Sequence, residues 1–424
     1  MGLKDTASLA LIPAAYKTSK IYSALPTDGD GDFTFIRTGN ATRVNKAGLV
    51  ETMGTNIGRL NYDLTNGTPA SCPSLLLEPS RTNLLTQSET YTTVSKANLT
   101  VADNTSIVDP QGGTNTKTLT ATNTDQPRLE WRGTAVPASN TSYAMSFWVR
   151  YNTARYVAIA HYSQSGEYAI FDLVDGEVES DVGTQTAKIE EYPNDWYKIS
   201  KSFEVPSTAI VNYWKFTLCT QTNAFVGVNG EKADVFGMQL EAGTYPTSYI
   251  PTSGSAVTRN VDTCKLENFA NMPTDYPFTV FWEGKIDEYE GGGFTTQVIF
   301  SLVATGEYNC YFALNFSNTN TLTIRRRNST DTSQSVAFSS NQNTIYKVAV
   351  CFISSTAVKV YINGSGVFNS TNLVSVPYVG TNTPDTVLIG QLRNTVDTGK
   401  RNSCDQFMLF NEALTDSELQ TLTS

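Results

Sequence analysis

The chain has 424 residues, 17% of them charged, and 30 Lys and Arg against 40 Asp and Glu give a net charge of −10 at pH 7. An acidic chain without a long basic block is poorly suited to hold a phosphate backbone, and no run approaches the roughly 18 apolar residues of a membrane span, so nucleic-acid binding and membrane insertion are excluded. The 21 Tyr and 20 Phe exclude a disordered chain. With polarity supplied mainly by Ser, Thr and Asn, the composition favours an all-β protein that is either secreted or part of a virion.

The first 92 residues contain short apolar segments between turns. An apolar stretch broken by Pro13 is too short for an independent helix, and we interpret residues 1–25 as a docking segment. Residues 28–32 have the aspartate spacing with which calcium loops start, but Gly39 occupies the twelfth position, where such a loop needs Glu. We therefore predict a turn there, followed later by a short buried strand at Leu75–Leu77.

Alternation of apolar and polar residues dominates the middle of the chain and predicts strands with one buried face. The runs 143–149, 196–205 and 213–218 show it clearly, and Asp175-Gly176 and Asn229-Gly230 supply tight turns. The Pro-, Thr- and Ser-rich stretch Tyr245–Gly254 is predicted to be a linker.

The same alternation returns after the predicted linker. It is strongest in 278–286, 346–352 and 358–362, and Asn363-Gly364 then predicts a hairpin turn. Near the end, Thr415 followed three residues later by Glu418 predicts a capping box and a short terminal helix. Short strands without intervening long helices indicate antiparallel sandwiches. The expected fold is therefore all-β: an N-terminal region at 1–92, a sandwich at 93–255, a second sandwich at 256–424 and a short C-terminal helix.

The cysteines and the single histidine argue against a metal centre, and we expect no cofactor. The six cysteines include no C-x-x-C pair and are too sparse for a disulfide scaffold, so most are predicted to be buried free thiols, with one bridge in the C-terminal third left open. These are Cys72, Cys219, Cys264, Cys310, Cys351 and Cys404.

Three groups of segments carry resemblances to known families. Ala41–Glu51 and Pro73–Leu85 look like the N-terminal region of tailed-bacteriophage structural proteins. Ser142–Val149 and Phe236–Thr252 are similar to the carbohydrate-binding-module-like jelly rolls of such proteins. The last group resembles the closing strands and final helix of concanavalin-like, laminin-G-like lectin sandwiches, and consists of Val358–Gly364 and Asp405–Leu419.

The resemblance implies a virion appendage in which an anchor carries two lectin-like sandwiches. It does not imply that either sandwich binds sugar, because jelly rolls also serve as plain building blocks. No calcium-ligand set of the laminin-G family can be matched to residues of this chain.

Sugar binding is the sharper hypothesis for a site, because sugars pack their apolar faces on exposed aromatic rings. Four aromatic residues lie on the polar phase of their strands and are predicted to form a platform on one sheet of the middle sandwich. The alternative is that a second layer or a neighbouring subunit covers them. The four are Trp148, Tyr156, Tyr162 and Tyr213.

Catalytic chemistry finds little support. His161 falls on the apolar phase with Val157 and Ile159, which predicts a packed core histidine, and the acids near Asp175 fit a solvated turn better than a glycosidase pair. The only basic run, Arg325–Arg327, is interpreted as a solvated strand edge, with a patch for an acidic glycan or an acidic partner as the alternative.

We therefore expect a non-enzymatic phage head or tail fibre, or receptor-binding protein, located in the virion. Its N-terminal region would contact capsid or tail proteins, its chains would form a homo-oligomer, by analogy a trimer, and its sandwiches would be free to meet a host surface glycan. Two alternatives remain: a capsid-decorating or adaptor protein whose sandwiches make only protein contacts, and a glycan depolymerase.

Overall fold

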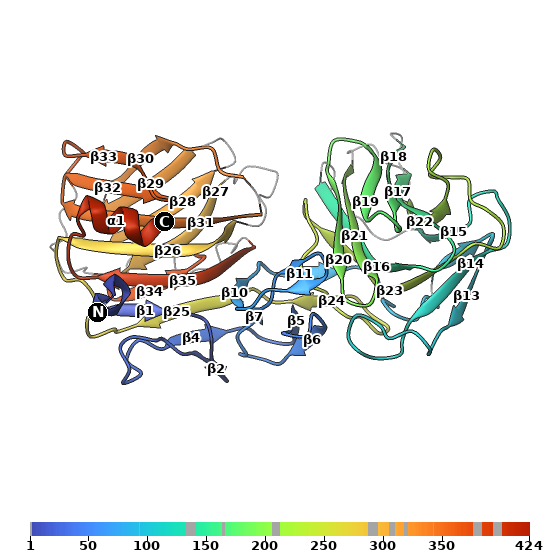
Figure 1. Cartoon of the computed structure of the whole chain (residues 1–424), viewed down its shortest axis with the longest axis horizontal. Helices are drawn as coiled ribbons and strands as arrows, with labels where there is room; N and C mark the ends of the chain where they lie inside the picture. The colour runs from blue at the N-terminus through green and yellow to red at the C-terminus, as the bar shows by residue number, and fades with distance from the viewer. Residues whose placement is uncertain are drawn as a thin grey trace.

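A computed structural model of the chain consists of two β-sandwich lobes joined by short two-stranded ribbons (Figure 1). Both chain ends lie on the C-terminal lobe, where the blue N-terminal segments run beside the orange and red strands. The residues described are 2–92, 94–132, 141–162, 166–205, 213–286, 296–304, 310–317, 321–328, 330–341, 343–375, 384–392 and 401–424.

The middle sandwich is built from two antiparallel sheets, which we name after a central strand. The β17 sheet has the order β12 (Ser95–Ala97), β15 (Arg128–Arg132), β22 (Tyr213–Cys219), β17 (Tyr156–Tyr162), β18 (Glu167–Asp172) and β19 (Glu177–Val182). The β16 sheet has the order β13 (Leu99–Asp103), β14 (Lys117–Ala121), β23 (Lys232–Ala242), β16 (Thr141–Tyr151), β21 (Trp196–Val205) and β20 (Ala187–Tyr192).

The C-terminal sandwich also has two sheets. The β26 sheet has the order β33 (Ser365–Ser370), β32 (Ala357–Ile362), β31 (Thr344–Ser354), β26 (Phe278–Ile286), β35 (Asn402–Phe410), β10 (Ser74–Leu77) and β7 (Leu60–Asn61), with β1 (Leu9–Leu11) also paired to β35. The β28 sheet has the order β2 (Tyr16–Lys17), β3 (Lys20–Ile21), β4 (Phe33–Ile36), β25 (Thr263–Glu267), β34 (Thr386–Ile389), β27 (Thr296–Val303), β28 (Cys310–Ser317), β29 (Thr321–Asn328) and β30 (Thr330–Ala337).

Alternation along the strands explains both cores and confirms the all-β prediction. The inward residues predicted for β16, such as Tyr143 and Phe147, share one buried cluster with Ile199 of β21 and Phe216 of β22. The predicted inward residues of β31 and β32 join a second buried cluster in the C-terminal sandwich, as do those of β26 except Ile286, whose side chain lies outside the described residues. Burying one face of each strand is the driving force that sets which way these sheets face.

Strands from the first 92 residues complete the C-terminal sandwich. Leu9 and Leu11 of β1 are fully buried, and Leu9 pairs with Leu409 of β35. Leu75 of β10 pairs with Cys404, which confirms the predicted buried strand there. The segment 1–25 thus docks on the chain's own sandwich, while a contact of this region with another protein stays a prediction.

The remaining elements are short. Three ribbons pair β5 (Ala41–Val44) with β6 (Val50–Met53), β8 (Leu64–Thr65) with β9 (Thr68–Pro69) and β11 (Arg81–Asn83) with β24 (Val257–Arg259). A 3-10 helix spans Leu3–Thr6, and α1 (Asp416–Thr423) begins with the predicted capping box. Among the described residues, no helix has the length and apolar character needed to cross a membrane.

The hairpin predicted at Asn363-Gly364 connects β32 and β33. Both residues have positive φ, 46° and 77°, a conformation that Asn and Gly adopt more readily than other residues. The cysteine prediction also holds where the structure tests it, because Cys219, Cys264, Cys351 and Cys404 are buried and free. Cys72 is free but exposed, and the side chain of Cys310 lies outside the described residues.

The predicted linker at Tyr245–Gly254 is wrong. Tyr245, Thr247 and Tyr249 are buried, and Gln239 on β23 accepts a hydrogen bond from the backbone N–H of Ile250 at 2.6 Å. The segment carries many Pro, Thr and Ser residues because its turns and side-chain hydrogen bonds need them, and not because it is flexible.

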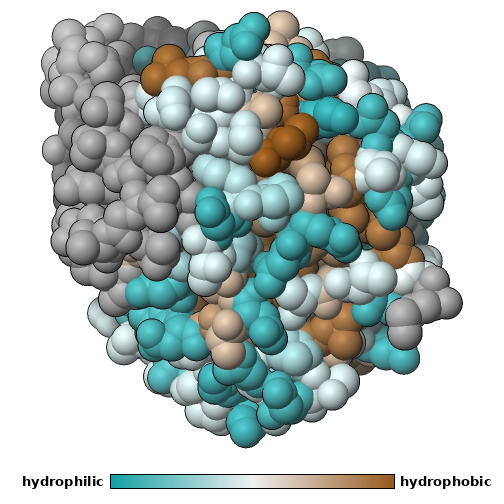
Figure 2. Space-filling view, turned by 90° about the vertical axis from the view of Figure 1, so that its left-hand side faces the viewer, coloured by the Kyte–Doolittle hydropathy of each residue, from teal (hydrophilic) through white to brown (hydrophobic). Residues whose placement is uncertain are grey.

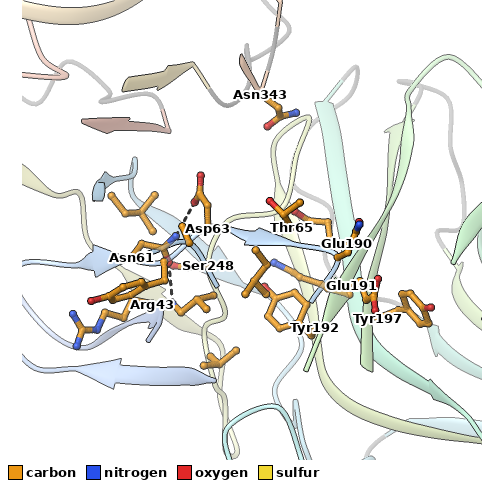
Figure 3. A pocket seen from close by; sticks show the side chains of 18 of the residues that line it. Arg43, Asn61, Asp63, Thr65, Glu190, Glu191, Tyr192, Tyr197, Ser248 and Asn343 are labelled. Atoms are coloured by element: carbon orange, nitrogen blue, oxygen red, sulfur yellow. Dashed lines mark hydrogen bonds between the residues drawn. The ribbon is translucent and has the colours of Figure 1, made fainter. Parts of the chain in front are cut away.

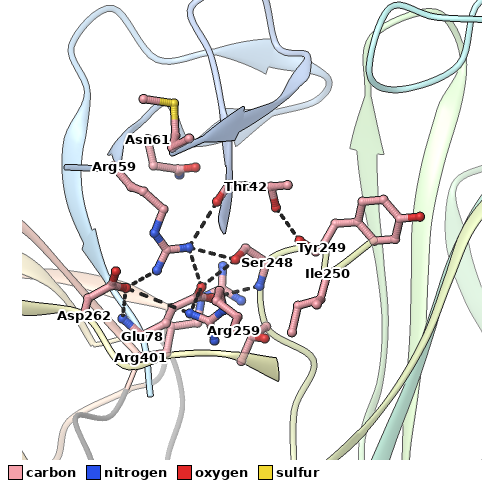
Figure 4. Close-up of polar contacts among 12 residues, drawn as sticks. Thr42, Arg59, Asn61, Glu78, Ser248, Tyr249, Ile250, Arg259, Asp262 and Arg401 are labelled. Carbon is pink, nitrogen blue, oxygen red and sulfur yellow. Dashed lines mark hydrogen bonds and ion pairs between the residues drawn. The ribbon is translucent and has the colours of Figure 1, made fainter. Parts of the chain in front are cut away.

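A buried ionic network, shown in Figure 4, holds this segment against the N-terminal region. Arg59 contacts the carboxylates of Glu78 and Asp262, and its Nη1 lies 2.6 Å from Glu78 Oε2. Arg259 lies 2.9 Å from Glu78, and Arg37 lies 3.1 Å from Asp262. Ser248 donates to the same Glu78 carboxylate at 2.6 Å. The network therefore ties the chain before the middle sandwich to the chain after it.

Candidate functional site

The outer face of the β17 sheet carries two of the four aromatic residues predicted to bind sugar, Tyr156 and Tyr213. Tyr156 and Tyr213 are half-buried, and Tyr162 pairs with Tyr213 across β17 and β22. The side chain of Tyr162 lies outside the described residues. Val157 and Ile159 point into the core, so strand alternation places Tyr156, Ala158 and Ala160 on the outer face as predicted.

Trp148 does not belong to this face, and the predicted four-residue platform on one sheet is wrong. Trp148 lies on β16, in the opposite sheet, and only 1% of its surface is exposed. Its ring makes edge-to-face contacts with Tyr192 and Tyr249 at centroid distances of 5.7 and 5.3 Å. The alternation was assigned correctly, but the segment Tyr245–Gly254 covers the outer side of this sheet.

Charged residues that sequence reasoning missed lie beside Tyr213. Glu130 on β15 pairs with Arg128 at 2.8 Å and also contacts Arg132, and Lys215 on β22 lies 3.9 Å away from it. Arg132 lies over the Tyr213 ring at 5.2 Å. The alternation of residues in Arg128–Arg132 is the signal that could have placed the side chains of Arg128, Glu130 and Arg132 on one face.

The electrostatics of this cluster follow from three bases around one acid. Burial opposes the ionisation of Glu130, but the hydrogen bonds from Arg128 and Arg132 outweigh it and lower its pKa. Burial, followed by the positive charge of Arg128, lowers the pKa of Lys215. The face therefore offers an excess of positive charge beside an aromatic ring, on a chain with a net charge of −10.

A loop covers the other half of the same face. Phe225 meets Tyr168 edge to face at 5.8 Å, and with Ala224 it packs over Ala158 and Ile170. On the remaining half, Tyr213 is half-buried and Arg132 is exposed, while Lys215 and Ala160 are 7% and 1% exposed and Lys215 Nζ lies 5.8 Å from the centroid of the Phe225 ring. The part of this face that is open to a ligand is therefore the edge formed by Tyr213 and Arg132.

A second concave region lies between the two lobes (Figure 3). Its volume is about 760 Å³, and it is lined by the N-terminal ribbons, by β20 and β21 of the middle sandwich and by residues of the C-terminal sandwich. Trp148 contributes to its lining. Sequence reasoning could not find this cleft, because three distant parts of the chain build it.

The histidine considered for catalysis lies in the core of the middle sandwich. His161 is buried, as predicted, and its ring lies 4.3 Å from that of Trp214, centroid to centroid. Within the described ranges, no group of three or more His, Cys, Asp or Glu side chains is placed to hold a metal ion.

The interpretation of Arg325–Arg327 as a strand edge is wrong. These residues lie on β29, which is hydrogen-bonded between β28 and β30. Arg326 is 2% exposed and donates to the carbonyl oxygens of Ser355 and Val374 at 2.7 and 3.0 Å. Its side chain shares the inward phase of Leu322 and Ile324, so it closes the end of the core instead of facing solvent.

Among the described residues at the far end of the C-terminal sandwich, the surface shows a mixture of residue kinds (Figure 2). In Figure 2 its hydrophobic residues appear as small islands among hydrophilic and neutral ones. Scattered apolar residues of this kind are normal for a protein surface and indicate no site.

Several solved structures are similar to about a third of this chain. Among solved structures, the chain is similar to the CBM40 of the Ruminococcus gnavus IT-sialidase bound to alpha2,3 sialyllactose, with 17% identity over 35% of this chain and 84% of that one and a TM-score of 0.30. It is similar to the NanB sialidase from Streptococcus pneumoniae, with 21% identity over 35% and 24% of the two chains and a TM-score of 0.29. The heptameric SAP-like pentraxin from Limulus polyphemus shows 18% identity over 35% and 70%, with a TM-score of 0.27.

A search of curated proteins finds no match. Residues 258–420 match the family model of the concanavalin A-like lectin/glucanases superfamily. This match covers the strands of the C-terminal sandwich from β25 onward and the first residues of α1, and it confirms the concanavalin-like lectin fold expected for that part of the chain.

Proposed function

We propose that this protein is a non-enzymatic, glycan-binding appendage of a tailed-bacteriophage particle. The observation that carries the glycan-binding part is the edge of the β17 sheet's outer face, where the half-buried Tyr213 lies beside the exposed Arg132 and its ion-pair partner Glu130. The lectin-type fold of residues 258–420 also supports it.

The chemistry of this face suits a sugar. An aromatic ring receives the apolar face of a pyranose, while ion-paired side chains present donors and acceptors in fixed directions to the hydroxyl groups. Arg132 and Glu130 hold each other in place, so neither must lose much conformational freedom when a ligand arrives. The positive excess would also attract a sugar that carries a carboxylate.

The virion part of the proposal rests on the sequence resemblance of Ala41–Glu51 and Pro73–Leu85 to phage structural proteins. In it, residues 1–92 contact a capsid or tail protein, and the protein assembles into a homotrimer. Because β1, β7 and β10 are already paired within the C-terminal sandwich, the attachment would use the loops and ribbons between these strands.

Glycan binding can be measured on an array of host-surface and common oligosaccharides. Tyr213→Ala should weaken binding at least tenfold. Tyr151→Ala removes an exposed tyrosine (42% exposed) on a strand of the opposite sheet, and should leave binding unchanged. Absence of binding to every glycan, or equal loss in both variants, would contradict the proposed face.

The two remaining parts have separate tests. Immunogold labelling of purified particles should place the protein on the virion, and its absence from particles would remove that part of the proposal. Incubation with host polysaccharide should leave the chain length of the polysaccharide unchanged, whereas shortened chains would show a depolymerase.

A further inference from the structure

The cleft between the lobes has the size and the polarity of a ligand site. Its volume of about 760 Å³ falls within the roughly 300–1,000 Å³ typical of small-molecule sites. Figure 3 shows Thr65 and Asn343 at its upper rim, with Glu190, Glu191 and Tyr192 on the side of the middle sandwich. These rim groups are hydroxyls, amides and carboxylates, which together can donate to and accept from sugar hydroxyls.

The charges in the cleft argue for an uncharged ligand. Four bases among the described residues line the cleft, and each has a partner. Lys285 lies 2.6 Å from Asp63, Arg43 lies 2.9 Å from Glu51 and Arg401 lies 3.6 Å from Glu78. Lys198 donates to the carbonyl oxygen of Thr247 at 3.2 Å. Glu190 and Glu191 on β20 are exposed at the rim. A ligand with a carboxylate or sulfate would meet these two acids and would find Lys285 and Arg43 already paired.

One lining residue of the cleft, Trp148, is buried and carries a donor without a partner among the described residues. A Cβ at Gly237 would lie 3.0 Å from Trp148 Cε3, so the benzo edge of the indole faces β23 and its Nε1 points away from that strand. Nε1 is buried and has no hydrogen-bond partner among the described residues, which is costly unless another molecule supplies one. Lys198 lies over the same ring at 5.2 Å and also lines the cleft.

The cleft is also held in shape before any ligand arrives. The network of Arg59, Glu78 and Asp262 fixes the chain segments that enter and leave the middle sandwich, and the Lys285–Asp63 pair joins the C-terminal sandwich to the N-terminal ribbons. A site with fixed walls loses less entropy on binding than one that must first be assembled.

We propose that the cleft between the lobes, with Trp148 among its lining residues, is a second binding site and that it takes an uncharged oligosaccharide. The site is separate from the outer face of the β17 sheet and does not rest on the function proposed for that face.

The test uses the full chain and titration calorimetry with cello-, malto-, chito- and mannotetraose, and with tetragalacturonate as an anionic counterpart of the same length. At least one uncharged tetrasaccharide should bind. Thr65→Trp, an exposed rim position, should fill the cleft and weaken that binding at least tenfold. Thr68→Trp is the matched control, because Thr68 is exposed and pairs with Thr65 but does not line the cleft.

The outcomes separate the two proposals. Loss of binding in Thr65→Trp with retention in Thr68→Trp and Tyr213→Ala supports the cleft. Loss in Tyr213→Ala alone would place the sugar on the outer face and overturn the cleft proposal while leaving the proposed function intact. Failure of all four uncharged sugars to bind, or binding of tetragalacturonate that is equally tight and equally sensitive to Thr65→Trp, would overturn it.

Discussion

Arg59 and Glu78 meet at 2.6 Å with both side chains fully buried. Arg59 precedes β7 by one residue and Glu78 directly follows β10, so the pair lies where the N-terminal strands leave the C-terminal sandwich. Three further charged residues, Arg37, Arg259 and Asp262, share the same network. Buried charges of this kind are tolerated only when each has a partner, which makes any single member difficult to replace.

Glu78→Gln should destabilise the protein by about 3–5 kcal/mol, because it leaves the buried guanidinium groups of Arg59 and Arg259 with too little negative charge. Glu51→Gln is the control: it breaks a pair with Arg43 whose acid is largely exposed, and should cost roughly 0–1 kcal/mol. Urea unfolding of both variants gives the comparison. Equal losses of stability would mean that the buried network contributes no more to stability than the Arg43–Glu51 pair does.

Acidification should lower the stability of the protein through protonation of Glu78. Burial opposes the ionisation of Glu78, but Arg259, Arg59 and Arg401 outweigh it and hold the pKa of Glu78 well below its ordinary value. A lowered native pKa gives stability that is complete above the unfolded pKa of roughly 4.3 and is lost as the pH falls through the native pKa.

The measurement is the free energy of unfolding from pH 7 down to pH 3 for the native protein and for Glu78→Gln. The native protein should lose more stability than the variant over the acid part of this range. Parallel curves would show that Glu78 does not titrate in this way.

Trp148→Ala should lower the stability of the fold, whatever its effect on ligand binding. The ring is buried among Trp196, Phe236 and Tyr249, so its removal should cost about 3–5 kcal/mol. Tyr213→Ala, at a half-buried position, should cost less than half as much. Thermal unfolding of the two variants checks this difference. A mild effect of Trp148→Ala would contradict the buried position of its ring.

Thr415→Ala should remove the cap of α1 at a cost of about 1 kcal/mol. The Thr415 hydroxyl accepts the backbone N–H of Glu418 at 3.3 Å, and α1 buries Leu419 and Leu422 against the β26 sheet. Thr421→Ala serves as the control, because its exposed hydroxyl bonds only to the carbonyl oxygen of Ser417. Denaturant unfolding that does not distinguish the two would contradict the capping role.

Local patterns were enough to predict the strands, the hairpin and the terminal helix. Alternation is a property of each strand alone, so the inward residues Phe147, Ile199 and Val280 could be identified before their partners were known. Asn363-Gly364 and Thr415 likewise act over a few residues, and local chemistry determines their structure.

Features that depend on distant segments could not be predicted in the same way. Trp148 lies on the polar phase of its strand, yet a segment some hundred residues later in the sequence covers it with Tyr249. Arg326 belongs to a basic run but ends inside a core. The inter-lobe cleft needs Thr65, Glu190 and Asn343 together, and no spacing in the sequence indicates that they meet.

The pairing of β1 with β35 has a consequence for how the chain reaches its native state. Leu9 in the first strand of the C-terminal sandwich is synthesised 409 − 9 = 400 residues before its partner Leu409. The strands of the middle sandwich all come from one continuous stretch of the sequence. This sandwich can therefore fold while β1, β4 and β10 still lack their partner strands from the C-terminal part of the chain. Such delayed, non-local pairing slows folding and leaves apolar strands such as Leu9–Leu11 exposed to aggregation in the meantime. Production at low temperature or with chaperones should therefore raise the yield of soluble protein.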